Sequence, residues 1–320
     1  MTTAVLPSAA EIRQAADALR EVAPPTPLVE TAGLSRLVGV PVWLKCEFWQ
    51  PMGAFKVRGA WTAITRLSAE ARAKGILTHS SGNHGQAVAF VAQRLGLRAV
   101  IVMPKTAPQV KVDGVRSFGG EIVFTEASTT ARLEKAAAVQ AEQGLTMVPP
   151  YDDPDIVLGQ ATCAYEILER ARDIGTFLAP IGGGGLLAGT CVTVQAYAPG
   201  ARVVGVEPEG AAKLSAALAA GQPTQLERTG SIADGLLPLS VGRLTFEYIR
   251  PVVREAVQVS DDEIGRAVKY LYHEQGLRVE PSGAVGVAAL LTGKLRPTTA
   301  TAVILSGGNV DPVLFAKLVG

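Results

Sequence analysis

The sequence predicts an α/β protein whose sheets are mostly parallel and are covered by helices on both faces. Two observations lead to this fold class: short apolar runs typical of buried strands alternate with segments of helical periodicity, and glycine-rich turns follow several strands. The length of 320 residues suits two domains or one large α/β unit. Hydrophobic residues make up 48% and charged residues 18%, so a large core is expected and disorder is not.

The first half of the chain supplies most of the alternation. A capping box from Ser8 to Glu11 opens a helix that runs to residue 22. After it we expect strands at residues 40–46, 76–79, 99–103 and 121–125, and helices at residues 57–67, 83–95, 110–118, 128–143 and 155–172.

The second half repeats the pattern. We expect strands at residues 176–181, 202–207 and 301–305, with helices at residues 186–197 and from the capping box at Ser260 to residue 274. Ligands of parallel sheets bind beyond the carboxyl ends of the strands. Functional residues are therefore expected in the turns that follow the strands.

Composition and charge argue against several classes of partner. The formal net charge is +1 without a basic or acidic tail, so neither nucleic acid nor a membrane surface is expected. The most apolar long window, residues 177–198, is broken by Pro180 and a run of glycines, and residues 1–13 lack the pattern of a signal peptide. Cys46, Cys163 and Cys191 form no metal motif, and we expect buried, reduced thiols in a cytoplasmic protein.

The run Gly182-Gly183-Gly184-Gly185 stands between a predicted strand and a predicted helix. Ordering four glycines loses much backbone entropy, and a set of backbone N–H groups around a phosphate would explain it. A second interpretation stays open here, because Gly183, Gly185 and Ala188 also fit a GxGxxA dinucleotide fingerprint and Glu207 ends the next strand.

Two further turns follow predicted strands. Ser80-Ser81-Gly82-Asn83-His84-Gly85 places small residues and exposed amides at a helix start, which suits a carboxylate or a phosphate but is also ordinary capping chemistry. Ser306-Gly307-Gly308-Asn309 is a tight turn with one hydroxyl at a strand end, and by itself it indicates a structural role.

Lys56 decides between the interpretations. It follows a Pro/Gly turn, lies among apolar residues and stands at the start of a predicted helix. A lysine is ordinarily a solvated surface residue, but here apolar surroundings and a helix N-terminus both lower the pKa of the amine. Such an amine can act as a nucleophile toward an aldehyde.

Five motifs in one order give a family resemblance that covers residues 25–311. They are GAFKVRGA around Lys56, SSGNHGQA from Ser80, GGGG from Gly182, EPSG from Glu280 and SGGN from Ser306. With them the chain resembles the fold-type II pyridoxal-phosphate enzymes, in the threonine dehydratase and serine racemase branch. The resemblance implies a tryptophan synthase β-like fold with two open, twisted, mostly parallel sheets. It also favours pyridoxal 5′-phosphate over a dinucleotide, which would leave Lys56 unexplained.

The resemblance implies roles for individual residues. Lys56 would condense with the cofactor aldehyde and later move the α-proton of the substrate. The other cofactor contacts would be Phe55 beside the ring, Asn83 at the 3-hydroxyl, Ser306 at the pyridine nitrogen, and Gly182, Gly183, Gly184 and Gly185 at the phosphate. The substrate carboxylate would bind to the turn formed by Ser80, Ser81, Gly82, Asn83 and His84.

The implied activity is the dehydration of β-hydroxy-α-amino acids such as L-threonine or L-serine to a 2-oxo acid and ammonia. Two alternatives stay open. One is a dehydratase of β-aryl serines such as L-threo-3-phenylserine, suggested by Ala54, Phe48 and Trp49. The other is a serine or amino-acid racemase with side dehydratase activity. A β-replacement synthase shares the fold but fits the SSGNHG turn less well.

Three features depart from the family pattern. Ala54 replaces a common serine, which puts ordinary cofactor geometry in doubt. Ser81 replaces the alanine of many threonine dehydratases and matches serine racemases, so it is a second candidate catalytic residue that could reprotonate the α-carbon. Glu207 and Ala211 match positions of the racemase divalent-metal site, but Lys213 replaces its acidic ligand, and we expect no metal there.

By analogy with the family, residues 1–74 and 151–320 would form a large cofactor-binding domain. Residues 75–150 would form a smaller mobile domain that closes on the substrate. The family is usually dimeric, so a homodimer that acts on a small amino acid is expected. The chain ends soon after SGGN, so the regulatory domain of biosynthetic threonine deaminases is expected to be absent.

Overall fold

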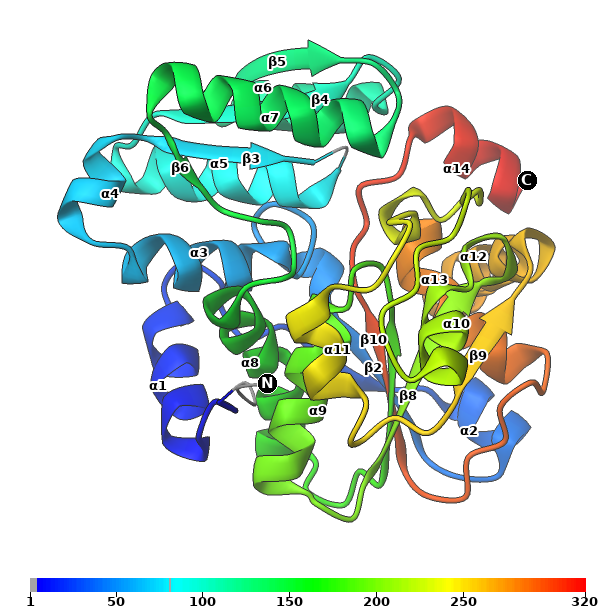
Figure 1. The fold of residues 1–320 in the computed structure, drawn as a ribbon. Helices are drawn as coiled ribbons and strands as arrows, with labels where there is room; N and C mark the ends of the chain where they lie inside the picture. Colours follow the sequence, from blue (N-terminus) through cyan, green and yellow to red (C-terminus); the bar gives the residue numbers. More distant parts are fainter. Residues whose placement is uncertain (1–4, 81) are drawn as a thin grey trace.

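The computed structural model describes residues 5–80 and 82–320, which are built around two β-sheets (Figure 1). The larger sheet has six strands in the order β1-β2-β10-β7-β8-β9; the β1–β2 pair is antiparallel and the other pairs are parallel. Its strands are β1 (Leu28–Glu30), β2 (Val42–Cys46), β7 (Thr176–Pro180), β8 (Arg202–Pro208), β9 (Ala256–Val259) and β10 (Thr301–Leu305).

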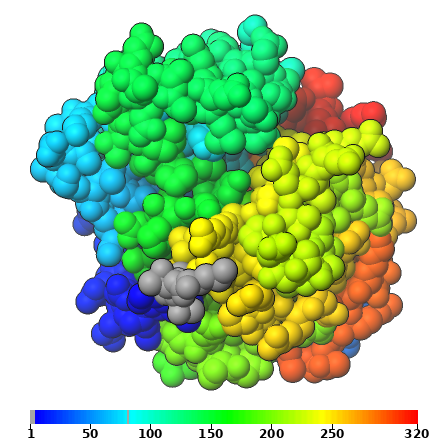
Figure 2. Space-filling model, viewed as in Figure 1, coloured from blue at the N-terminus to red at the C-terminus, as the bar shows by residue number. Residues whose placement is uncertain are grey.

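The smaller sheet has four parallel strands in the order β5-β4-β3-β6. All of them come from one stretch of the chain, as β3 (Ile76–His79), β4 (Ala99–Pro104), β5 (Glu121–Thr125) and β6 (Thr146–Met147). The prediction of an α/β fold with two open, mostly parallel sheets is therefore confirmed. The space-filling view shows the cyan-to-green part of the chain, which holds the smaller sheet, packed directly against the rest (Figure 2).

Helices cover both faces of the larger sheet because alternate residues of its strands point to opposite sides. Phe177 and Ala179 of β7 pack with α8 (Pro154–Arg170) and α9 (Gly185–Tyr197). Leu178, between them, packs with α12 (Asp261–Gln275) and α13 (Pro281–Leu291) on the other face.

The smaller sheet is covered in the same way. Ile101 of β4 packs with α5 (Asn83–Leu95) and α6 (Gln109–Ser117), whereas Val100 packs with α7 (Thr129–Gln143). The loops that leave β3 and β7 therefore start helices at the carboxyl edges of the sheets, as predicted for the functional turns.

Local sequence signals explain several helix starts. Ser8 and Glu11 form the predicted capping box of α1 (Ala9–Leu19), and Ser260 and Glu263 form that of α12. The Asp153 side chain accepts bonds from the first amides of α8, where Pro154 needs no hydrogen-bond partner for its nitrogen. The boundaries of the predicted elements therefore agree with the structure within a few residues.

The helix α13 was not predicted. It is buried along nearly its whole length and apolar on all sides, so it lacks the polar face that gives a helix its periodicity in sequence. The other elements without a prediction are short: β1, β6, β9, α2 (Ala32–Val38), α4 (Ala69–Ala73), α10 (Lys213–Ala220), α11 (Arg243–Ile249), α14 (Pro312–Val319) and the 3₁₀ helices η1 (Glu47–Trp49), η2 (Glu209–Ala211) and η3 (Asp234–Leu236).

Glycines let three helices cross closely. A Cβ at Gly159 of α8 would lie 2.6 Å from Gly59 Cα in α3 (Lys56–Arg66), and a Cβ at Gly189 of α9 would lie 2.6 Å from Ala161 N in α8. In this way α8 contacts both α3 and α9, as can be followed in Figure 1.

Two expectations from composition concern the whole chain. Cys46, Cys163 and Cys191 are buried and unpaired, as expected for reduced thiols. In the part of the chain that the structure describes, every helix is too short or too polar to cross a lipid bilayer.

Candidate active site

The turn Gly182–Gly185 connects β7 to α9 and presents a row of free backbone amides. None of the described residues accepts a hydrogen bond from the N–H groups of these four glycines. The Gly183 carbonyl instead accepts bonds from Gly242 N at 3.0 Å and from Thr245 Oγ1 at 2.8 Å, which hold the turn from behind. Together with the N-terminus of α9, the free amides form a binding site for an anion such as phosphate.

Crowding and backbone shape explain why glycines occupy this turn. A Cβ at Gly183 would overlap the ring of Tyr151, and a Cβ at Gly182 would lie 2.9 Å from the Gly235 carbonyl oxygen. Gly184 has a φ of 104°, in the left-handed region that favours glycine. Side chains at these positions would displace the walls of the turn.

Lys56 begins α3 close to this turn. Its Nζ donates a hydrogen bond to the Pro150 carbonyl oxygen at 2.6 Å, and the next residue, Tyr151, packs against Gly183. The side chain keeps some accessible surface, yet burial in the surrounding protein lowers the pKa of Lys56 to about 8. A larger share of this amine is therefore unprotonated at neutral pH than in an exposed lysine. Nζ also lies 5.3 Å from the centre of the Phe55 ring.

The segment after β10 runs beside the Lys56 turn. Phe55 N donates to the Ser306 carbonyl oxygen at 3.0 Å, and Ala54 and Gly307 form an isolated β-bridge. The Ser306 side chain is buried there. A Cβ at Gly307 would lie 3.1 Å from the Ala54 Cβ, so the space beside Ala54 is crowded. The GAFK and SGGN motifs, distant in sequence, are therefore adjacent in space.

The turn after β3 is shaped by its own polar side chains. Ser80 Oγ accepts a bond from Gly82 N at 3.1 Å. His84 is buried, with Nε2 at 3.2 Å from the Val148 carbonyl oxygen and no partner for Nδ1 among the described residues. Burial, together with the charge of Lys56, lowers the pKa of His84 well below its usual value, so the ring is neutral. Ser81 lies outside the described residues.

Asn83 is held from two sides in this region. Its Nδ2 donates to Glu280 Oε1 at 2.6 Å, and its Oδ1 accepts from Asn309 Nδ2 at 2.9 Å. A Cβ at Gly307 would lie 3.0 Å from Asn83 Nδ2, so the SGGN segment approaches this amide closely. The predicted residues Lys56, Asn83 and Ser306 and the tetraglycine turn are thus connected through direct neighbours.

Four residues of this region were given no role at the level of sequence. Glu280 was singled out only as part of the EPSG motif, and Tyr151 carried no signal. Lys111 and Asp234 are 123 positions apart in sequence, but Lys111 Nζ donates to Asp234 Oδ2 at 2.6 Å and lies 3.5 Å from Glu280 Oε2. Only the tertiary structure brings these charges together.

At the corner after β8, a lysine takes part in local hydrogen bonding. Lys213 is buried and its Nζ donates to the Ala211 carbonyl oxygen at 2.7 Å. The Glu207 carboxylate accepts bonds from the backbone amides of Leu214 and Ser215. Within residues 5–80 and 82–320, no three histidine, cysteine or acidic side chains gather in a way that would hold a metal ion.

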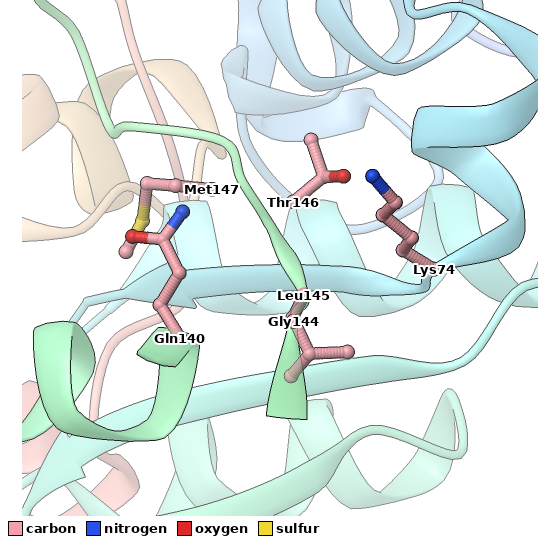
Figure 3. Close-up of a pocket in the computed structure, with 6 residues that line it drawn as sticks. All are labelled: Lys74, Gln140, Gly144, Leu145, Thr146 and Met147. Atoms are coloured by element: carbon pink, nitrogen blue, oxygen red, sulfur yellow. The ribbon is translucent and has the colours of Figure 1, made fainter. Parts of the chain in front are cut away.

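Figure 3 shows the residues that line an open depression on the surface. It borders β6 at the edge of the smaller sheet and contains none of the predicted site residues. Its lining residues are Lys74, Gln140, Gly144, Leu145, Thr146 and Met147. The chemistry of the Lys56 region, with a low-pKa amine and free amides, identifies that region instead as the candidate active site.

The residues around Lys56 suit a cofactor with an aldehyde at one end and a phosphate at the other. A lysine whose pKa is lowered can condense with the aldehyde, and the free amides of Gly182–Gly185 can bind the phosphate. Both features belong to the residues themselves, so the fit does not depend on the family resemblance.

Comparisons with known proteins agree with this fit. A family model described as pyridoxal-phosphate dependent enzyme matches residues 19–307. Serine racemase of Arabidopsis thaliana is 39% identical over 306 residues, which are 94% of this chain and 92% of that protein. Beta-hydroxyaspartate dehydratase of Paracoccus denitrificans is 41% identical over 287 residues, 89% of this chain and 91% of that protein.

A solved structure is similar over almost the whole chain. The processed form of threonine deaminase isoform 2 from Solanum lycopersicum has a TM-score of 0.89 and 35% identity, and the match covers 99% of this chain and 96% of that one. The free amides, the low-pKa lysine and the similarity over nearly full length lead to one conclusion. The chain belongs to the family of pyridoxal-phosphate-dependent enzymes, and its cofactor is pyridoxal 5′-phosphate.

Proposed function

We propose that the protein is an ammonia-lyase that dehydrates β-hydroxy-α-amino acids of the L-threonine and L-serine type to a 2-oxo acid and ammonia. The observation that carries the proposal is that the Lys56 amine and the tetraglycine turn both adjoin the Pro150–Tyr151 segment, the amine at the Pro150 carbonyl and Gly183 at the Tyr151 ring. Relatives named as a dehydratase and a deaminase of such amino acids support it.

In this proposal the protein holds the cofactor at both ends. Lys56 would hold the aldehyde carbon, and the amides of Gly182–Gly185 would hold the phosphate. Phe55 would pack beside the ring, with Asn83 at the 3-hydroxyl and Ser306 at the pyridine nitrogen. When bound, pyridoxal 5′-phosphate withdraws electrons from the α-carbon of the amino acid and makes its α-proton acidic.

The protein side chains then bind the substrate and move its proton. The turn from Ser80 to His84 holds the substrate carboxylate at the start of α5. Once the substrate amine has displaced Lys56 from the aldehyde carbon, neutral Lys56 would take the α-proton on Nζ, and a pKa of about 8 suits a general base that works near neutral pH. The β-hydroxyl would then leave as water with a proton from the cofactor phosphate, and hydrolysis of the released product would give the 2-oxo acid and ammonia. Ser306, a neutral hydroxyl rather than a carboxylate, favours elimination because it does not keep the ring nitrogen protonated.

The domain assignment belongs to the same proposal. Residues 75–150, which carry the smaller sheet and the Ser80–His84 turn, form a mobile domain that closes on the substrate against residues 1–74 and 151–320. We further propose that the enzyme is a cytoplasmic homodimer, as is usual in the family.

A panel of four substrates tests the proposal. We expect 2-oxo acid and ammonia in equal amounts from L-threonine or L-serine, and the panel adds threo-3-phenylserine and 3-hydroxyaspartate to define the side chain. Lys56→Ala is the control and should abolish turnover. No product from any of the four substrates would show that the enzyme is not such a dehydratase.

Racemisation is a second candidate activity. The relative from Arabidopsis thaliana is named serine racemase, and the hydroxyl of Ser81 would be the proton donor to the second face of the α-carbon. Chiral analysis of the serine left in the assay measures D-serine directly. Full racemisation by Ser81→Ala would exclude Ser81 as the second proton donor.

The β-aryl serine alternative has weaker support from the aromatic residues. Trp49 is 60% exposed, so its indole is not enclosed in a site for a substrate ring. Phe48 stacks edge-on against Trp49 at 6.0 Å. Ala54 remains the feature that motivates phenylserine, and the substrate panel decides its relevance.

A further inference from the structure

The orientation of the Asn83 amide is fixed by its two partners. A carboxylate oxygen of Glu280 can only accept from it unless the acid is protonated, so the Asn83 atom that faces Glu280 at 2.6 Å is the nitrogen. The opposite atom faces the Asn309 amide nitrogen at 2.9 Å and is therefore the oxygen. Asn83 Nδ2 carries a second N–H, which stays available for another acceptor.

Burial and two charged side chains, Lys111 and Asp234, determine the state of Glu280. Burial raises the pKa of Glu280 to about 6; Lys111 opposes this rise and Asp234 adds to it. Although burial disfavours a charged lysine, Glu280 and Asp234 hold the pKa of Lys111 above its usual value. With both carboxylates charged, the group of three carries a net charge of −1 in a largely buried place, which favours uptake of a proton.

We infer that Glu280 is a positioning residue, whose carboxylate fixes the Asn83 amide beside the cofactor while Lys111 and Asp234 set the charge of that carboxylate. The inference rests on the proposed contact between Asn83 and the 3-hydroxyl of the cofactor. A hydrogen bond to a charged acceptor is about twice as strong as one to a neutral acceptor. Protonation of Glu280 therefore weakens its hydrogen bond to Asn83 and loosens the position of the amide beside the cofactor.

The visible absorbance of the bound cofactor reports on this arrangement without turnover. In the holoenzyme we expect its absorbance to change with pH, with a midpoint near the Glu280 pKa of about 6. The pKa of His84 lies well below its usual value, and in the holoenzyme the Lys56 amine is bonded to the cofactor, so neither side chain titrates near pH 6. The cofactor phosphate has its own pKa of about 6, but a transition of the phosphate would persist in Glu280→Gln. Glu280→Gln should remove the transition near pH 6.

Two charge variants give shifts of opposite sign. Lys111→Met removes a cation that favours the charged carboxylate, so the midpoint should move to higher pH. Asp234→Asn removes an anion that disfavours it, so the midpoint should move to lower pH. Asp234 is more exposed than Lys111, so Asp234→Asn should fold even if Lys111→Met does not, and the shift of its midpoint can then still be measured. If Glu280 only stabilised the fold, the two variants would not shift the midpoint in opposite directions.

Cofactor affinity provides a second measurement. The glutamine of Glu280→Gln still offers an oxygen to Asn83, so the dissociation constant for pyridoxal 5′-phosphate should rise by less than about threefold, whereas Glu280→Leu should raise it by about tenfold. Glu207→Gln is the matched control, because Glu207 is also buried but binds only local groups after β8. It should leave both the midpoint and the affinity unchanged.

The inference is overturned if Asp234→Asn and Lys111→Met shift the midpoint in the same direction, or if Glu280→Gln keeps the transition near pH 6. Failure of the proposed function is a separate result. An enzyme that is inactive on all four substrates but shows the ordered shifts would refute the dehydratase proposal and support the role of Glu280.

Discussion

Replacing Arg58 with methionine would remove the centre of a buried ion network at the start of α3. Arg58 Nε and Nη2 bind the Glu47 carboxylate at 2.7 and 2.8 Å, and Nη1 and Nη2 bind the Glu166 carboxylate at 2.6 and 2.8 Å. Lys45 Nζ also binds Glu166, and all four side chains are at most 6% exposed. The two cations balance the two carboxylates, so the native network is neutral.

In Arg58→Met, Lys45 is left to balance two buried carboxylates. Removing one partner of a buried ion pair costs about 3–5 kcal/mol, because the other charge stays buried without compensation. An unfolding entropy of about 2.1 cal/mol/K per residue gives roughly 0.7 kcal/mol/K for a chain of this length. The melting temperature should therefore fall by about 4–7 °C.

Differential scanning calorimetry of the holoenzyme measures this change. The matched control is Arg66→Met in the same helix, because Arg66 pairs with Asp155 at 2.6 Å while its side chain is 52% exposed. Exposed pairs contribute about 0–1 kcal/mol, so the control should melt within about 2 °C of the wild type. If Arg58→Met melts at the temperature of Arg66→Met, the buried network does not stabilise the fold as described.

Three further predictions concern the candidate active site. Stopped-flow absorbance measures the rate at which the apoenzyme reacts with pyridoxal 5′-phosphate. This rate should rise with pH around a midpoint of about 8, and a midpoint near 10.5 would contradict the lowered pKa of Lys56. Because folded Lys56 loses its proton at lower pH than unfolded Lys56, the apoenzyme should also gain stability between about 8 and 10.5, and Lys56→Met should reduce that gain. Gly183→Ala should weaken cofactor binding by at least about tenfold in a fluorescence titration, because its Cβ would displace Tyr151. The control Gly200→Ala adds a Cβ in open space and should change the affinity by less than about twofold. Equal affinities of the two variants would show that the Gly182–Gly185 turn does not enclose the phosphate closely.

Much of the candidate site could be predicted because its residues stand in short local motifs. Lys56, Ser80, Gly182 and Ser306 each follow a strand or turn, and the geometry of parallel sheets brings such turns together. The structure makes these segments neighbours through the Ala54–Gly307 bridge and the Lys56–Pro150 hydrogen bond. Their roles toward cofactor and substrate remain predictions, and Ser81 has no described geometry.

The sequence by itself determined the alternation of strands and helices, the capping boxes and the glycine turn, because each depends on neighbours a few residues apart. Only the tertiary structure decided which charges share one buried place. Glu280, Lys111 and Asp234 come from three separate segments, as do Arg58, Glu47 and Glu166, so no local pattern reveals their pairing. Their pKa values and their hold on Asn83 and α3 depend on burial and on distances of a few ångströms, which arise only when the chain is packed.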